Sequence, residues 1–397
     1  MEKWKEYQLK DVTTILGDGL HGTPKYDENG TVFFINGNNL VDGKIEIKDS
    51  TKRVSEDEAS KYKKNLNNRT ILVSINGTIG NVAKYKGEPC ILGKSACYFN
   101  VAEDFDLNFI YYVVASQQFK NTITRLATGT TIRNVSLETM RNYSFIAPSI
   151  DEQKRISAIL SSLDSKIELN RRINGNLEQQ AQALFKAWFV DFEPFDKNTN
   201  GIPYNWEKIS LSDIMDYSGG SQPPASEFIN TYQDGYIRFI QIRDYASNSH
   251  ITYIPISPRN KLCQKEDIMI ARYGASLGRI CYGLEGAYNV ALAKVTPKRP
   301  YYREFLRCYL SCNDFYEGIN KKGNRAVQAG FNQSDINSFE LWFPKDNSIL
   351  ERFEEICRNL FKARMYNNKE NERLSKLRDT LLPRLMSGKL NVNTITE

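Results

Sequence analysis

The chain has 397 residues, of which 25% are charged and 41% hydrophobic, and a formal net charge of +6. This length is typical of two domains, the composition is ordinary for a globular protein, and the mild basic excess suits a polyanionic partner. The sequence contains no run of about 18 apolar residues that could span a membrane, and it opens without the apolar run of a signal peptide. We therefore expect a cytoplasmic protein with no membrane contact.

A first globular domain is predicted over residues 1–149. Within it, the run Ile-Leu-Val-Ser-Ile at residues 71–75 is typical of a buried strand. Gly77 and Gly80 follow, and they predict a turn because glycine adopts positive φ without steric cost. The domain is predicted to end where Pro148 precedes a long helical pattern.

A first long helix is predicted over residues 150–192. Positions of its core recur every seven residues at Ile156, Leu163, Asn170, Leu177 and Leu184. A companion series, also of period seven, consists of Leu160, Ile167, Asn174, Ala181 and Trp188. Two such interleaved series are the seam of a coiled coil. Asn174-Gly175 is a turn signal, but the seven-residue register passes through Gly175 without a skip, so we expect one continuous helix.

A polar linker is predicted over residues 193–205, after which the pattern of the first half returns. Trp206 and Leu211 repeat the spacing of Trp4 and Leu9, and the apolar run 268–271 repeats the predicted strand. A second domain is therefore predicted over 206–346, a second helix over 347–388 and a C-terminal tail over 389–397. The heptad positions of the second helix are Phe353, Leu360, Asn367, Leu374 and Leu381. We expect this helix to end near Pro383, with Gly388 just beyond.

The repeat of domain and helix predicts an α+β protein with pseudo-twofold internal symmetry. We expect two similar globular α/β domains, separated by two long helices that pack as an antiparallel coiled coil. An asparagine in a coiled-coil core weakens the pair but fixes its register. Asn170 and Asn367 occupy equivalent positions of the two helices, so they either meet across the seam or face solvent.

The known motifs of catalysis are missing from the sequence. The chain has two histidines, His21 and His250, which argues against a histidine-dependent triad or a histidine-rich metal site. Gly93-Lys94-Ser95 resembles the end of a P-loop, but the earlier glycine of that signature is one position out of place. The seven cysteines form no Cys-x-x-Cys pair and fit buried, reduced thiols. We predict no catalytic, cofactor-binding or metal-binding residue.

The ends of both long helices resemble one known family, the specificity subunits of type I restriction–modification systems. The matching segments are Pro-Ser-Ile-Asp-Glu-Gln-Lys-Arg-Ile at 148–156, Leu-Phe-Lys-Ala-Trp-Phe-Val-Asp-Phe-Glu-Pro-Phe at 184–195, and Leu-Leu-Pro-Arg-Leu-Met-Ser-Gly at 381–388. Gly-Thr-Ile-Gly at 77–80 and Gly-Leu-His-Gly-Thr-Pro at 19–24 are similar to turns of that family. The second copy departs from the latter with Gly-Gly-Ser-Gln-Pro-Pro at 219–224, as expected of two domains that read different sequences.

The resemblance implies a non-catalytic subunit that recognises double-stranded DNA. Each globular domain would be a target-recognition domain for one half of a bipartite site, and the helices would set the spacing and dock two modification (adenine methyltransferase) subunits. Restriction (translocase/endonuclease) subunits would join the same complex. S-adenosylmethionine, ATP and Mg are expected on the partners and no cofactor on this chain. Adenine-N6 methylation and ATP-dependent DNA cleavage are thus expected only in the assembly.

Base edges are read by donors and acceptors that project into a groove, and phosphates by lysine, threonine and backbone amides. In the first domain the candidates for such contacts are His21, Thr23, Asn36, Asn38, Asn39, Thr78, Thr130, Thr131 and Arg133. In the second domain they are Gln222, Gln241, Arg243, Arg272, Tyr273, Lys321, Lys322, Asn324 and Arg325, of which the last four belong to the densest basic loop of the chain.

An aromatic cluster at the end of the first helix is a candidate interface for a partner subunit, because aromatic residues are enriched in the cores of interfaces. The cluster comprises Phe185, Trp188, Phe189 and Phe192. The alternative is that these side chains pack against the protein's own helix pair.

Two other functions fit parts of the sequence. One is a DNA-acting enzyme with an unrecognised active site. The other is a coiled-coil scaffold that binds protein but not DNA. The target sequence, the gap length, the presence of restriction subunits and self-association do not follow from the residues.

Overall fold

The computed structural model describes residues 4–129, 133–247, 250–323, 330–390 and 392. The chain divides into two compact units. Unit 1 comprises residues 1–169 and 370–397, and unit 2 comprises residues 170–369. The division falls inside the two long helices, so each unit combines one globular domain with one part of each helix.

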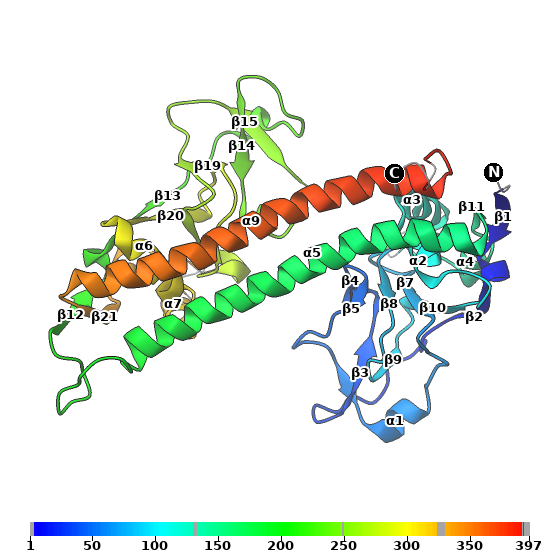
Figure 1. Ribbon diagram of the computed structural model, residues 1–397, viewed down its shortest axis with the longest axis horizontal. Helices are drawn as coiled ribbons and strands as arrows, with labels where there is room; N and C mark the ends of the chain where they lie inside the picture. The colour runs from blue at the N-terminus through cyan, green and yellow to red at the C-terminus, as the bar shows by residue number, and fades with distance from the viewer. Residues whose placement is uncertain (1–3, 130–132, 248–249, 324–329, 391, 393–397) are drawn as a thin grey trace. The chain divides into compact units, whose positions relative to one another are not determined.

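The two long helices are α5 (Ile150–Phe185) and α9 (Asn347–Met386), which run alongside each other in Figure 1. In unit 1, Asp164 of α5 accepts a hydrogen bond from Arg378 of α9 at 2.8 Å. In unit 2, the Asn174 and Asn367 amides of the same two helices are hydrogen-bonded at 2.9 Å. Also in unit 2, Glu178 of α5 pairs with Arg364 of α9, so residue numbers rise along α5 as they fall along α9 and the helices are antiparallel, as predicted.

All ten heptad positions are buried or half-buried. Their side chains therefore face the other long helix or the domain of the same unit. Asn170 is almost completely buried, and Asn367 bonds to Asn174. Helix α5 is continuous through Gly175, which confirms that prediction. Glycine is tolerated there because the heptad contacts on either side, and not local propensity, stabilise the helix.

The ends of the long helices differ in detail from the sequence prediction. Helix α5 passes into one π-helical turn, η3 (Lys186–Val190). Helix α9 ends at Met386, shortly after Pro383 and just before Gly388, close to the predicted end. Pro383 is exposed and lies in the last turns, so the hydrogen bond that its missing N–H group removes, to the carbonyl of residue 379, is among the last of the helix. Gly388 follows with a φ of 69°.

The domain of unit 1 is built on a four-stranded antiparallel sheet in the order β2-β10-β7-β8. Its strands are β2 (Thr13–Asp18), β10 (Ala96–Val101), β7 (Thr70–Ser74) and β8 (Val82–Lys84). A smaller sheet has the order β6-β3-β9, with β6 (Arg53–Val54) antiparallel and β9 (Cys90–Leu92) parallel to β3 (Val32–Ile35). Strand β7 is buried at every residue, as its apolar sequence predicted.

Short elements complete the unit 1 domain. Strand β1 (Lys5–Gln8) pairs with β11 (Ser144–Ala147), β4 (Leu40–Val41) with β5 (Lys44–Ile45), and α1 (Glu56–Ser60) follows β6. The remaining helices are α2 (Leu107–Ala115), α3 (Gln117–Leu126) and α4 (Leu137–Arg141). Asp106, Ser116 and Ser136 cap their first turns by accepting backbone N–H groups, which places each helix start.

Unit 2 repeats this topology. Its main sheet has the order β13-β20-β17-β18, made of β13 (Met215–Gly219), β20 (Leu292–Pro297), β17 (Ile268–Ala271) and β18 (Ile280–Cys281). The second sheet, β15-β14-β19-β16, contains β15 (Thr252–Pro255), β14 (Tyr236–Ile240), β19 (Gly286–Tyr288) and β16 (Leu262–Cys263). Strands β14 and β19 are parallel, as are β3 and β9 in unit 1. The predicted tandem repeat is therefore confirmed.

Five further elements of unit 2 also have counterparts in unit 1. Strand β12 (Trp206–Ser210) pairs with β21 (Glu340–Pro344), as β1 does with β11. The helices are α6 (Arg303–Leu310), α7 (Asn313–Gly323) and α8 (Gln333–Asn337). No helix in the described part of the chain is both long enough and apolar enough to cross a membrane.

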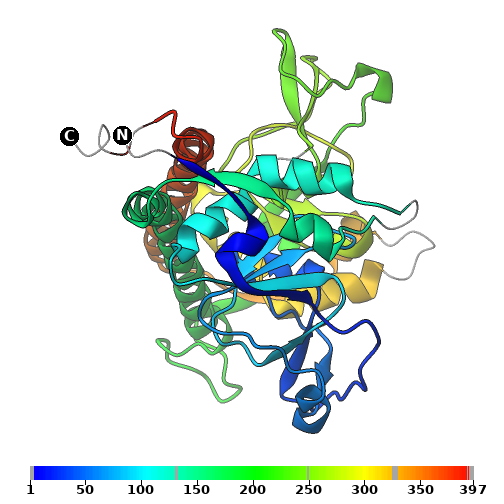
Figure 2. The ribbon, with the colours of Figure 1, turned by 90° about the vertical axis from the view of Figure 1, so that its right-hand side faces the viewer.

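Each domain shares a hydrophobic core with its parts of the long helices. In unit 1, Ile156 and Leu160 of α5 and Leu385 of α9 are buried among residues of the main sheet and of α2. The view of Figure 2 runs along the helix pair and shows both helices on one side of this domain. In unit 2, Phe185 of α5 and Phe353 of α9 are buried in the corresponding core.

The aromatic cluster at the end of α5 belongs to the core of unit 2. Phe185, Phe189 and Phe192 are buried, and Trp188 is half-buried. The ring of Phe189 lies 4.8 Å from that of Phe305 and 5.0 Å from that of Phe353, edge to face in both pairs. The assignment of this cluster to a partner interface is therefore wrong. Its rings are removed from the surface because they fill the space between α5, α6 and α9.

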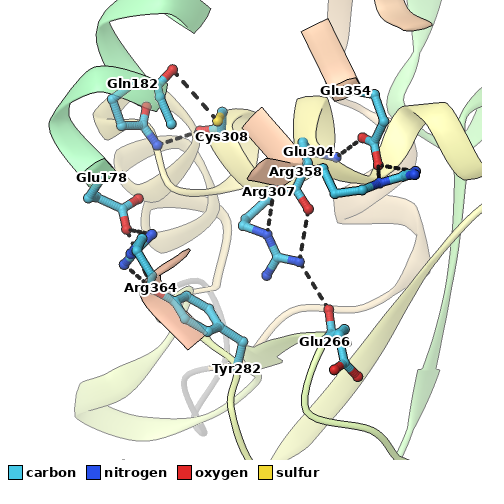
Figure 3. A network of polar contacts seen from close by, with 11 residues as sticks. Glu178, Gln182, Glu266, Tyr282, Glu304, Arg307, Cys308, Glu354, Arg358 and Arg364 are labelled. Atoms are coloured by element: carbon cyan, nitrogen blue, oxygen red, sulfur yellow. Dashed lines mark hydrogen bonds and ion pairs between the residues drawn. The ribbon is translucent and has the colours of Figure 1, made fainter. Parts of the chain in front are cut away.

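A buried polar network also joins the domain of unit 2 to both helices (Figure 3). Arg307 of α6 donates to Glu304 at 2.9 Å and to the Glu266 carbonyl at 3.0 Å, and the backbone N–H of Glu304 donates to Glu354 of α9 at 2.7 Å. Beside it, Arg364 of α9 bonds to Glu178 of α5. Burial raises the pKa of Glu304, and the Arg307 guanidinium opposes that rise.

Unit 1 uses different side chains at the corresponding junction. The hydroxyl of Tyr112 in α2 donates to Asp164 at 2.6 Å, and the same carboxylate accepts from Arg378 of α9. Burial alone would lower the pKa of Arg378, but its hydrogen bonds to Asp164 and Asp379 raise it. In each unit, therefore, charged side chains join the domain to its parts of the two long helices, and these are Asp164 and Arg378 in unit 1 but Glu304, Arg307 and Glu354 in unit 2.

Candidate nucleic-acid interface

Five loops of unit 1 meet at one end of its two sheets, and we call them loop cluster 1. They are residues 18–23 after β2, 36–39 after β3, 75–80 after β7, 93–95 after β9, and the segment 133–135. Backbone hydrogen bonds hold them together: Leu20 N–H to the Leu92 carbonyl at 2.7 Å, Gly93 to Ile35 at 2.8 Å, Ile75 to Ser95 at 3.0 Å, and Val135 to Ile75 at 2.8 Å. Parallel pairing of β3 and β9 brings their carboxyl ends to the same edge, which explains why the loops converge.

Unit 2 builds the same arrangement, which we call loop cluster 2. Its loops are residues 219–222 after β13, 241–245 after β14, 272–278 after β17, 289–291 after β19, and Gly330. The equivalent backbone bonds are Ser221 to Tyr288 at 3.1 Å, Asn289 to Ile240 at 3.1 Å, and Arg272 to Ala291 at 2.8 Å. Asn76 forms a bridge to Asn134 in cluster 1, and Tyr273 forms one to Gly330 in cluster 2. One loop framework is therefore built twice.

Glycines allow this close packing in both clusters. A Cβ atom added to Gly19 would lie 2.2 Å from the Leu92 carbonyl oxygen, and one added to Gly220 would lie 2.1 Å from that of Asn289. Gly77 and Gly274 have φ angles of 70° and 71° at matching turns. Side chains at these positions would clash or strain the backbone, so the loop framework depends on glycine.

Loop cluster 1 gathers most of the candidates predicted in the first domain. His21, Thr23, Asn38, Thr78 and Arg133 are exposed there. His21 Nε2 lies 2.6 Å from Asp18 Oδ2, which orients the imidazole. Thr130 and Thr131 lie outside the described residues. The cluster therefore offers a mixed set of polar and basic side chains on one set of adjoining loops.

Two asparagines of loop cluster 1 are used within the protein. Asn39 is buried and donates to the Glu46 carbonyl at 3.0 Å and the Thr51 hydroxyl at 3.1 Å, and its Oδ1 accepts the Asn36 N–H at 3.0 Å. The Oδ1 of Asn36 accepts from the Ser95 hydroxyl at 3.0 Å. The Asn39 amide holds the turn in shape, which leaves Asn38 as the outward-facing member of this loop.

Loop cluster 2 gathers five of the candidates of the second domain. Gln222, Arg243 and Tyr273 are exposed, and Gln241 and Arg272 are half-buried. The N–H of Gln241 donates to Asp244 at 2.9 Å, as the N–H of Asn36 donates to Asn39 in loop cluster 1. Because Asp244 therefore corresponds to Asn39, the residue before it, Arg243, corresponds to Asn38. Burial raises the pKa of Asp244, and its hydrogen bond from Gln241 opposes that rise.

The predicted basic loop is partly helical. Lys321 and Lys322 lie in the last turn of α7, while Asn324 and Arg325 lie outside the described residues. The same helix contacts loop cluster 2, since the Asn320 amide donates to the Leu277 carbonyl at 3.2 Å. Lys321 is highly exposed, with Glu317 as a partner at 3.8 Å, and Lys322 lies over the Phe339 ring.

Replacing Lys321 and Lys322 by alanine is expected to weaken binding to all DNA sequences alike. Each phosphate contact that is lost lowers the slope of log K against log salt concentration by about 0.9. The double variant should thus lower the slope by about 2. Lys208→Ala is the control, since it removes an exposed lysine of β12 that pairs with Glu340 of β21. Binding assays over a salt series that gave equal slopes for both variants would contradict this assignment.

Sequence reasoning missed several polar residues of the loop clusters, among them Lys94, Ser221 and Asn289. Lys94 is an exposed member of loop cluster 1, and its Gly-Lys-Ser triplet joins strand β9 to strand β10 without the helix that a P-loop requires. Ser221 and Asn289 belong to loop cluster 2. Aligning the two copies at their strand ends would have placed Ser221 opposite Leu20 and Asn289 opposite Gly93, a change from apolar to polar at both positions.

Comparison with known proteins follows the same division into two copies. Residues 1–179 and 203–368 match the family described as type I restriction modification DNA specificity domain. The specificity subunit of type I restriction enzyme MjaIX from Methanocaldococcus jannaschii is 26% identical over 82% of this chain and 78% of that protein. The HindI specificity subunit from Haemophilus influenzae is 23% identical over 66% of this chain and 72% of its own.

A solved structure shows a similar fold over nearly the whole length. The crystal structure of the S subunit of a type I restriction-modification system from M. genitalium has a TM-score of 0.56, with 21% identity, over 97% of this chain and 96% of the other. The family match alone covers most of both domains and both long helices. This chain therefore belongs to the type I restriction modification DNA specificity domain family.

Proposed function

We propose that this chain is the DNA-recognition subunit of a type I restriction–modification complex. The observation that carries the proposal is the single loop framework built twice with different outward-facing side chains. Asn38 and Thr78 of loop cluster 1 occupy the positions that Arg243 and Ala275 occupy in loop cluster 2. Two such surfaces can read two different half-sites, because base edges are distinguished by the donors and acceptors set against them.

In this proposal each loop cluster reads one half of a bipartite site. The candidates that remain for cluster 1 are the exposed side chains His21, Thr23, Asn38, Thr78, Lys94 and Arg133. Those for cluster 2 are Gln222, Gln241, Arg243, Arg272 and Tyr273, with Lys321 and Lys322 of α7 as phosphate contacts. The net charge of +6 supports a polyanionic ligand.

The long helices are proposed to dock two modification subunits, and restriction subunits are proposed to join the same complex. Exposed apolar side chains on the helices support a protein partner: Ile173, Ile356 and Tyr366 in unit 2, and Leu169 and Leu377 in unit 1. Single exposed apolar residues are common, but a 70% exposed tyrosine on a helix suits an interface. These residues replace the buried aromatic cluster as candidates for that surface.

S-adenosylmethionine, ATP and Mg are assigned to the partner subunits. No group of three or more histidine, cysteine or acidic side chains that could hold a metal ion occurs in the described ranges. In this proposal the chain binds and positions DNA for chemistry that other subunits perform.

Deleting the gene is expected to abolish methylation of one split adenine motif in the cell. The measurement is a genome-wide map of methylated adenines with and without the gene, and a plasmid copy should restore the motif. A strain that keeps every methylated motif after the deletion would overturn the proposed function. An enzyme acting alone would instead modify or cut DNA as the purified chain, and a scaffold would bind no DNA in a salt-dependent gel shift.

A further inference from the structure

Five buried polar atoms of loop cluster 2 have no hydrogen-bond partner among the described residues. Two of them, Asp244 Oδ1 and Tyr245 Oη, lie on the loop after β14. The other three lie on the loops after β13, β17 and β19, and they are the Ser221 hydroxyl oxygen, the Arg272 Nε and the Asn289 Oδ1. Adjoining loops carry them, since Ser221 bonds through its backbone to Tyr288, and Arg272 bonds through its backbone to Ala291. Leaving a buried polar group without a partner costs about 1–3 kcal/mol, so three on loops that are hydrogen-bonded to one another indicate a missing ligand.

Packing against neighbouring residues holds the Arg272 side chain in place. Its guanidinium lies 5.0 Å from the centre of the Tyr273 ring. A Cβ atom at Gly219 would come within 2.6 Å of Nη1, so the glycine leaves room for the side chain. In the described part of the chain no acidic residue forms an ion pair with Arg272. The guanidinium is therefore oriented in advance while its N–H groups stay available to a ligand.

Unit 1 has apolar residues at the same three places of the framework. Equivalent backbone hydrogen bonds in the two clusters show which positions correspond: Leu20 to Ser221, Ile75 to Arg272, and Gly93 to Asn289. Ile75 is almost completely buried. The shared loop framework therefore needs none of the three polar side chains, and their presence in unit 2 serves something other than folding.

We propose that Arg272, with Ser221 and Asn289, forms a reading site for a guanine in the half-site that unit 2 recognises. This rests on the proposed function. Guanine presents two acceptors, N7 and O6, in the major groove, and the arginine fork donates to both. A phosphate fits the group less well, because it offers only acceptors and would leave the Asn289 amide oxygen unpaired. Asn289 can accept from an amino group on the neighbouring base edge, such as the cytosine N4 paired with this guanine.

The test uses the complete methyltransferase complex carrying Arg272→Ile, which installs the residue of unit 1, or Arg272→Lys, which keeps the charge but loses the planar fork. Maps of methylated sites are expected to show that one guanine of the second half-site is no longer required, with discrimination at that base pair reduced about tenfold to a hundredfold in both variants. The first half-site should be unchanged, which also reports that the complex is assembled. Lys208→Ala, which removes an exposed basic residue outside loop cluster 2, should leave that guanine required.

Two results would overturn the inference. An unchanged motif would show that Arg272 reads no base. Equal weakening at all sequences, with an unchanged motif and a shallower salt dependence, would identify a phosphate contact. If the wild-type complex methylates no split motif, the proposed function itself fails, so the two failures are distinguishable. Should Arg272→Ile fail to assemble, Arg272→Lys alone decides between these outcomes.

Discussion

Lengthening both long helices by four residues is expected to widen the unread gap of the DNA site by one to two base pairs. Four helical residues add about 6 Å of rise and about 40° of rotation beyond a full turn. One base pair contributes about 3.4 Å and about 35°. A continuous helix transmits this change, whereas a flexible linker would blur it. The measurement is the motif found by mapping methylated adenines.

The insertion points follow from the division into units. Four residues placed after Leu169 of α5 and four after Lys369 of α9 leave every contact inside each unit intact. The bases of both half-sites should therefore stay the same while only the gap changes. Insertion into α5 alone is the control, and it should abolish methylation because the two helices then differ in length. An unchanged gap in the double insertion would refute the role of the helices as a ruler.

Replacing Arg307 by methionine is expected to lower the free energy of unfolding of unit 2 by about 3–5 kcal/mol. Arg307 and Glu304 are only 4% and 3% exposed, so removing the guanidinium leaves the carboxylate buried without its partner. The guanidinium also lies 3.7 Å from the centre of the Phe361 ring of α9, a contact that methionine cannot replace in kind. The domain of unit 2 should lose its fixed attachment to the helix pair.

Tryptophan fluorescence during urea unfolding would measure this effect, because Trp188, Trp206 and Trp342 lie in unit 2 and only Trp4 lies in unit 1. Lys208→Ala is the control, since its pair with Glu340 is exposed and worth at most about 1 kcal/mol. A double variant, Arg307→Met with Glu304→Leu, should recover most of the loss because no charge stays buried. If Arg307→Met were as mild as Lys208→Ala, the network would not hold the junction.

The residue pattern predicted the long helices and the repeat because both follow from the spacing of apolar residues along the chain. Heptads at Leu163 and Leu360 specify a buried stripe whatever surrounds them, and the continuity of α5 at Gly175 followed from an unbroken register. Matching apolar runs likewise predicted β7 and β17, and the glycines after them predicted the turns. The DNA-binding candidates of the loops stay predictions, since only contact with DNA would test them.

The composition and the recurring spacing of apolar residues by themselves determined an α+β tandem repeat with two antiparallel helices. The residues that resemble the family lie mainly at the ends of those helices. Tertiary structure alone decided which polar and aromatic side chains are available. The Asn39 amide forms hydrogen bonds within its own turn, and Phe189 is buried in the core of unit 2. Ser221, Arg272 and Asn289, by contrast, each keep a buried atom without a hydrogen-bond partner among the described residues. The physical reason is that burial and hydrogen-bond partners come from residues far away in the chain, on which local sequence carries no information.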